Sequence, residues 1–192
     1  MNVRPEQETA LAYARRVGTE APVASIVRRL ETTFGELDAE LAAVTPEAAA
    51  WSPGSGTWSV RQVVDHLVVS HRRATEQLAE LVAGRVPAGG PIPAGLLSPE
   101  PPDVPWPRLA GELRDTHAAF LRLVAATPDD TPLAARAPVE MVVKCAVEGG
   151  GTEPVHWVES FDWKAVAVLF RAHALEHLHQ VRRILAARDA AA

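Results

Sequence analysis

The chain has 192 residues, of which 47% are hydrophobic and 22% charged, and its formal net charge is −5. This length and composition predict a single globular domain, 1–192, rather than two domains or a disordered chain. Basic residues do not cluster, so the sequence offers no electrostatic surface for nucleic acid. It has no run of 18 or more apolar residues, so we expect no membrane-spanning helix.

The number of cysteines and the composition of residues 1–18 indicate the cellular compartment. Cys145 is the only cysteine, so no disulfide can form within the chain, as is usual in a reducing compartment. Residues 1–18 are polar and lack the apolar segment of a signal peptide. We therefore expect a cytoplasmic protein.

Apolar periodicity predicts helices in the first half of the chain. A short helix is expected at 6–16, broken by Gly18. Over 23–44 apolar residues recur at three- and four-residue steps, which is typical of an amphipathic helix. The next helix begins at Ser59, which with Gln62 forms a capping box.

A proline-rich segment follows this second long helix. Residues 85–107 contain eight prolines, too many for a helix or a central strand. A connection of this length is expected either to bridge two parallel helices or to cover a pocket.

The second half of the chain predicts two more helices and a hairpin. A third helix is expected at 109–124. Alternating apolar residues on both sides of Gly149–Gly151 predict a β-hairpin within 139–161. Asp162 then caps a last helix that extends to about Arg188.

Two histidines of the last helix point towards the core. At 100° per residue, His173 and His177 fall within the buried stripe, whereas His179 falls on the solvated side. Imidazoles four residues apart on a helix are neighbours and can bind one metal ion together. The alternative is a pair of hydrogen-bonded core histidines. Because each buried imidazole needs partners for both nitrogens, the spacing favours metal.

The same two histidines match the H-x-x-E-H pattern of inverted zinc peptidases. In those enzymes the third ligand is a carboxylate well downstream of the motif. Only fifteen residues follow His177, and Asp189 is the only acid among them. We interpret the match as accidental.

A third ligand is needed, and four histidines are candidates: His66, His71, His117 and His156. The segment 51–67, WSPGSGTWSVRQVVDHL, has a tryptophan-serine-valine-arginine helix start and a histidine before a leucine. It resembles the DinB/YfiT-like superfamily, as does the closing H-x-x-x-H pair with Gln180 three residues on. The resemblance covers most of 23–188.

This resemblance implies an all-α fold, a four-helix bundle of the DinB/YfiT-like type. Its core would span 23–188, with the Pro-rich crossover 85–107 between helices two and three and a small β-hairpin before the last helix. It also implies one divalent metal, zinc, nickel or iron, held by His66, His173 and His177. His71 would then lie behind the site or line a pocket.

Three imidazoles leave open positions on a metal, which is typical of a catalytic site. Such a metal activates either water or a thiol. The resemblance implies a small-molecule enzyme, a low-molecular-weight-thiol-dependent S-transferase using mycothiol or bacillithiol. A metal-dependent hydrolase is the alternative, and a non-catalytic, stress-related ligand-binding module is a competing hypothesis. A third reading is a scaffold that forms a homodimer, since bundles of this size often pair through helix faces.

Other side chains beside the ligands are weighed against structural roles. Glu176 is the candidate catalytic residue, for proton transfer, with a solvated helix charge as its alternative. Asp65 points away from His66 and is better explained as a solvated charge. Trp58 and Trp163 are expected to pack the ends of their helices.

Overall fold

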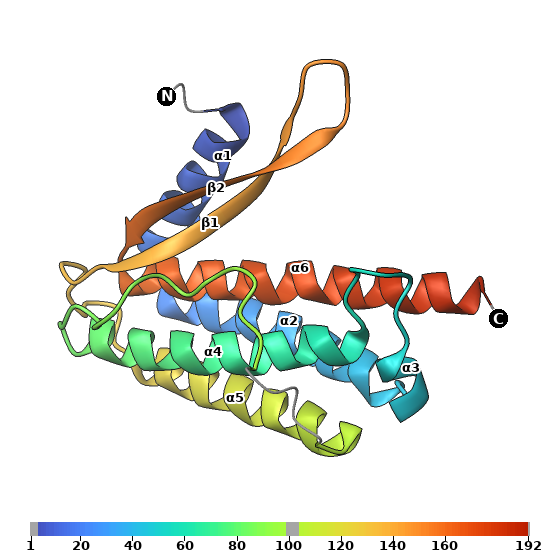
Figure 1. Ribbon diagram of the computed structural model, residues 1–192. Coiled ribbons are helices and arrows are strands. Elements are labelled where there is room, and N and C mark those ends of the chain that lie inside the picture. The colour runs from blue at the N-terminus through green and yellow to red at the C-terminus, as the bar shows by residue number, and fades with distance from the viewer. Residues whose placement is uncertain (1–3, 99–103, 192) are drawn as a thin grey trace.

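The structure is a computed structural model that describes residues 4–98 and 104–191. Its body consists of four long helices (Figure 1), α2 (Val23–Ala42), α4 (Val60–Val82), α5 (Trp106–Ala126) and α6 (Trp163–Asp189). Helix α2 packs against α5 and α6, and α4 packs against the same two helices. The predicted four-helix bundle is therefore confirmed.

Both predicted helix starts are present. The Ser59 side chain accepts from the backbone N of Gln62 at 3.2 Å, and the Gln62 side chain accepts from the backbone N of Ser59 at 2.9 Å. At the start of α6, Asp162 accepts from the backbone N of Ala165 at 3.0 Å. These caps satisfy backbone donors that a helix leaves unpaired. Because they fix the residue at which each helix begins, they also fix the side of the helix on which each histidine lies.

The connection between α4 and α5 has no regular helix or strand over 83–98. Of the predicted Pro-rich crossover, 99–103 lie outside the described residues. Its predicted end at 107 is wrong, because α5 already begins at Trp106 with Pro107 in its first turn, where proline costs no hydrogen bond. Figure 1 shows α4 and α5 running in the same direction, with this connection lying along the bundle.

The predicted hairpin is formed by β1 (Ala137–Ala146) and β2 (Thr152–Phe161). The strands are antiparallel, and their register pairs Ala137 with Phe161. In the turn, Gly149, Gly150 and Gly151 have φ of 91°, 95° and 93°, a region that glycine adopts without strain. The hairpin leaves the bundle at the end where α6 begins and projects away from it on the α6 side, next to α1 (Pro5–Tyr13) (Figure 1).

Two short elements were not predicted. The N-terminal helix continues as a π-helix over Ala14–Thr19, so the expected break at Gly18 is wrong. A five-residue helix, α3 (Pro46–Ala50), follows α2 and is capped by Thr45. None of the helices among the described residues is long and apolar enough to cross a membrane.

Position 18 has room only for glycine, because its backbone packs closely against α6. A Cβ at this position would lie 2.5 Å from the backbone Cα of Ala165. We expect Gly18→Ala to lower the free energy of unfolding by about 1–3 kcal/mol, because the backbones must move apart. Urea unfolding followed by circular dichroism measures this.

Gly35 gives a matched control. It is an exposed residue of α2, and a Cβ there would meet nothing within 4 Å. Gly35→Ala should raise the free energy of unfolding by about 0.5–1 kcal/mol, since glycine destabilises a helix interior. Equal effects of the two substitutions would refute the packing argument.

The hydrophobic core is divided in two along the bundle. One cluster contains Phe34, Leu78, Phe120 and Phe170, and the other contains Leu37, Leu67, Leu113 and Leu178. On α4, α5 and α6 histidines lie near the boundary between the two clusters, namely His71, His117, His173 and His177. A layer of imidazoles thus lies across the middle of the bundle.

Candidate metal centre

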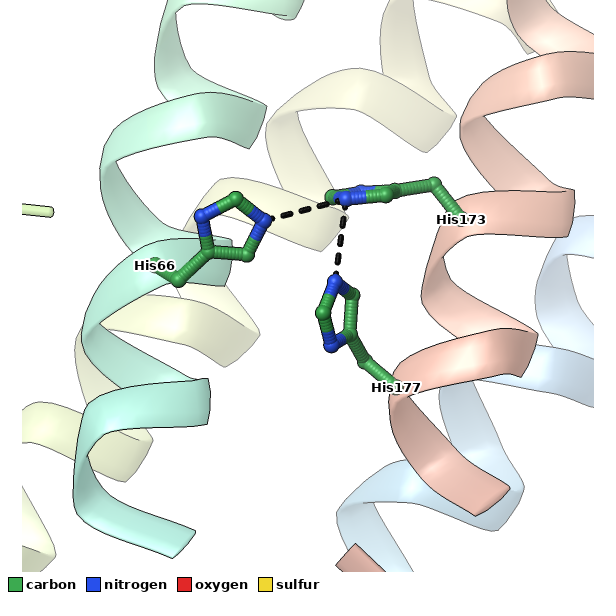
Figure 2. Close-up of side chains that lie close together, drawn as sticks. All are labelled: His66, His173 and His177. Atoms are coloured by element: carbon green, nitrogen blue, oxygen red, sulfur yellow. Dashed lines mark hydrogen bonds between the residues drawn. The ribbon is translucent and has the colours of Figure 1, made fainter. Parts of the chain in front are cut away.

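Three imidazoles meet inside the bundle, one from α4 and two from α6 (Figure 2). Nε2 of His173 lies 3.0 Å from Nε2 of His66 and 3.1 Å from Nε2 of His177. One ligand atom from each of these histidines falls within 4.8 Å of the others, and no other such group occurs among the described residues. The structure thus brings together the three residues named as metal ligands.

The outer nitrogen of each ring has its own partner. Nδ1 of His66 donates to the carbonyl oxygen of Leu96 at 2.6 Å, and Nδ1 of His177 donates to Oε1 of Gln180 at 2.8 Å. Nδ1 of His173 lies 2.9 Å from Nε2 of His71. A neutral imidazole has one N–H and one lone pair, so Nε2 of His66 and of His177 presents a lone pair to the shared space.

Two further imidazoles continue from His173 into the core. Nδ1 of His71 lies 2.9 Å from Nε2 of His117. The ring of Phe34 stacks on His117 at 4.0 Å between centroids, and the ring of Phe170 lies 3.9 Å from that of His71. Nδ1 of His117 is the one buried side-chain nitrogen or oxygen without a hydrogen-bond partner in the described part of the chain.

Burial keeps these histidines neutral. It lowers the pKa of His117 to about 3 and that of His177 to about 4. At His177 the electrostatic repulsion that two protonated rings would have, His66 and His177, lowers the pKa further. Burial also lowers the pKa of His66. For His71 and His173 it holds the pKa well below the ordinary value, and neighbouring histidines lower it further. At neutral pH every ring therefore has a lone pair available.

The donor set fits a divalent ion. Histidine nitrogens lie about 2.0–2.1 Å from bound zinc, so two of them around one ion would be about 2.9 Å apart at right angles and about 3.3 Å apart in a tetrahedron. The Nε2 separations of 3.0 Å and 3.1 Å lie between these two spacings. Imidazole is a suitable ligand for zinc, nickel and iron. His66, His173 and His177 can therefore hold one ion, with three protein ligands.

Trp58 lies against this centre, not simply at the end of its helix as the sequence suggested. Its ring centroid is 5.1 Å from that of His66 and 6.3 Å from that of His177. Trp58 and Gln180 also line a cleft of about 480 Å³ that includes Arg183. The cleft therefore adjoins His66 and His177 through Trp58 and Gln180, although no histidine lines it.

The two acids beside the ligands lie elsewhere. Asp65 is 7% exposed and accepts from the backbone N and the hydroxyl of Ser98, so its interpretation as a solvated charge is wrong. Glu176 is exposed, and its carboxylate lies 3.3 Å from the guanidinium of Arg183. Glu176 does not belong to the group of possible metal ligands, and its catalytic role stays a prediction.

The remaining histidine candidates are also placed. His71 and His117 lie behind His173, as expected for His71, whereas His156 is on the hairpin and pairs with Glu140 at 3.0 Å. Sequence reasoning missed Leu96 and considered His117 only as a candidate third ligand. Its position in the apolar stripe of 109–124 was a signal for burial, but nothing in one sequence pairs it with His71.

Comparisons with known proteins agree with this fold. The family model of the DinB superfamily matches residues 29–181. No curated protein matches the sequence. Among solved structures, TT2238, a four-helix bundle protein, aligns with a TM-score of 0.51 and 14% identity, covering 84% of this chain and 98% of that one.

A second solved structure is YfiT from Bacillus subtilis, reported as a probable metal-dependent hydrolase with an unusual four-helix bundle topology. It aligns with a TM-score of 0.55 and 16% identity, covering 95% of this chain and 89% of that one. At these identities the likeness concerns the fold.

Proposed function

The chain belongs to the DinB superfamily, and on that premise we propose that it is a divalent-metal-dependent enzyme that acts on a small molecule, in the first place a hydrolase. His66, His173 and His177 are the proposed ligands. The observation that supports this most directly is the convergence of their Nε2 atoms within 4.8 Å. Zinc, nickel and iron are all compatible with three imidazoles.

The residues around the ligands suit a reactive centre better than a closed structural one. A bound ion with only three protein ligands has open positions and lowers the pKa of a water or thiol that it binds. His173 and His177 are only partly buried, so the site is not sealed within the core. The adjoining cleft of about 480 Å³ has the size of a small-molecule site.

Two features of the cleft indicate how it would hold a substrate. Trp58 offers an aromatic face, and Arg183 offers a guanidinium at the same cleft. Arginine recognises carboxylates and other planar anions well. We infer a substrate with an apolar portion and an anionic group.

Hydrolysis is proposed first because the solved relative YfiT is reported as a probable metal-dependent hydrolase. Thiol transfer is the second candidate, with mycothiol or bacillithiol as the thiol. The observation that favours it is Arg183 in the cleft, since a thiol with a carboxylate, as bacillithiol has and mycothiol has not, would find a cation there. In both reactions the ion would lower the pKa of the nucleophile, which is water in hydrolysis and a thiol in transfer.

Metal content and turnover test this proposal together. Protein purified without chelator should contain about one divalent ion per chain by elemental analysis. The loaded protein should hydrolyse members of a panel of esters and amides, or conjugate an electrophile with an added thiol, and chelation should stop either reaction. Failure to bind zinc or nickel at micromolar concentration would exclude the metal enzyme. Binding without any turnover would support a non-catalytic module instead.

A further inference from the structure

Three imidazoles of this layer form a chain of hydrogen bonds. From the candidate metal centre it passes from His173 to His71 and on to His117, through contacts of 2.9 Å at each step. His71 and His117 are 1% and 2% exposed, so water does not compete for these contacts. The chain ends at Nδ1 of His117, which has no hydrogen-bond partner among the described residues.

Counting ring protons leaves two arrangements for this chain. Each neutral imidazole has one N–H and one lone pair, and each N···N contact needs one of each. In the first arrangement all three protons are on Nδ1, and His173 donates to His71, which donates to His117. In the second all three are on Nε2, and the donors point the opposite way. A mixed arrangement would put two protons or two lone pairs into one contact.

Only the first arrangement is compatible with a metal at His173. A ligating Nε2 must present a lone pair, which places the proton of His173 on Nδ1. His71 must then accept at Nε2 and hold its own proton on Nδ1, and the same follows for His117. In the second arrangement the proton on Nε2 of His173 would lie between the Nε2 atoms of His66 and His177.

We propose that His71 and His117 are positioning residues whose ring protons are coupled to metal binding, so that an ion at His173 sets both of them on Nδ1. The inference rests on the proposed metal function and extends it to two residues that lie outside the ligand set. It also places the last N–H of this hydrogen-bonded series on Nδ1 of His117, the atom without a partner among the described residues. An unsatisfied buried N–H opposes this arrangement, so the core itself restrains ion binding.

Nitrogen-15 NMR of the histidine rings tests the coupling directly. Long-range proton–nitrogen spectra of zinc-loaded protein at neutral pH distinguish the protonated ring nitrogen from the bare one. We expect His71 and His117 both to be protonated on Nδ1. Signals are assigned with His71→Phe and His117→Phe, and His179, exposed on α6, should show no change on adding zinc.

Zinc affinity of two variants gives a second readout. In His71→Gln the amide oxygen can still accept from Nδ1 of His173, so affinity should stay within about threefold of wild type. His71→Phe leaves that N–H buried and unpaired, and affinity should fall about 10- to 100-fold, as when other outer partners of metal-bound histidines are lost. Thermal melting of the metal-stripped variants shows whether each one folds.

The outcomes separate this inference from the proposed function. Zinc that shifts the signals of His66 and His177 while His71 or His117 keeps its proton on Nε2 would overturn the coupling and leave the metal site standing. Equal zinc affinity of His71→Phe and His71→Gln would overturn it too. A wild-type protein that binds no zinc would overturn both proposals.

Discussion

The substitution His173→Ala is expected to lower the affinity for zinc or nickel by at least about 100-fold, so that the purified variant contains almost no metal. Nε2 of His173 is the atom closest to both other candidate ligands, at 3.0 Å and 3.1 Å. Its loss leaves two imidazoles, fewer than the three protein ligands usual for a catalytic zinc ion. Isothermal titration calorimetry and elemental analysis measure the effect.

His179→Ala is the matched control on the same helix. His179 is exposed and lies two residues beyond His177, outside the group of possible ligands. This variant should bind metal as the wild type does. If His173→Ala retained a full equivalent of metal at wild-type affinity, the ion would be bound elsewhere and the candidate metal centre would be rejected.

The metal-stripped protein is expected to lose stability as the pH falls from 7 to 5, and His117 contributes a large share of this loss. Its pKa is about 3 in the folded state and about 6.5 for an unperturbed histidine. Between these values the unfolded chain binds a proton that the folded chain does not, so stability falls as the pH falls. At pH 5 this residue alone removes about 2 kcal/mol.

In the variant His117→Phe the free energy of unfolding should fall by about 2 kcal/mol less between pH 7 and pH 5 than in the wild type, because phenylalanine has no proton to bind. Urea unfolding at pH 7, 6 and 5 in the presence of a chelator gives the free energy of unfolding at each pH. His179→Ala should follow the wild-type curve. A wild type and a His117→Phe variant with parallel pH profiles would show that His117 is not held neutral by burial.

The helices of the bundle were predictable because local signals mark them. Ser59 and Asp162 are side-chain caps with the expected partners, and three consecutive glycines mark the hairpin turn. The π-helix at Ala14–Thr19 and the short α3 were missed. Neither has an apolar stripe of its own, and packing on other elements decides their conformation.

The candidate site was predictable in part. The four-residue spacing of His173 and His177 is a property of one helix, and it sufficed to identify that pair. The choice of His66 among four candidates depends on how α4 is placed against α6, which one sequence does not specify, and here it came from the family resemblance. Asp65 was misjudged because its partner, Ser98, lies in an irregular segment.

The contacts of this segment join the connection between α4 and α5 to the metal centre. Leu96 accepts from His66, and Ser98 donates to Asp65, the preceding residue of α4. Coupling between two binding events is reciprocal. If the ordered loop, by orienting His66, strengthens ion binding, then the bound ion stabilises the ordered loop by the same free energy. An ion held by His66 would therefore protect residues 96–98 from proteases, and cleavage of that loop would weaken the ion's hold.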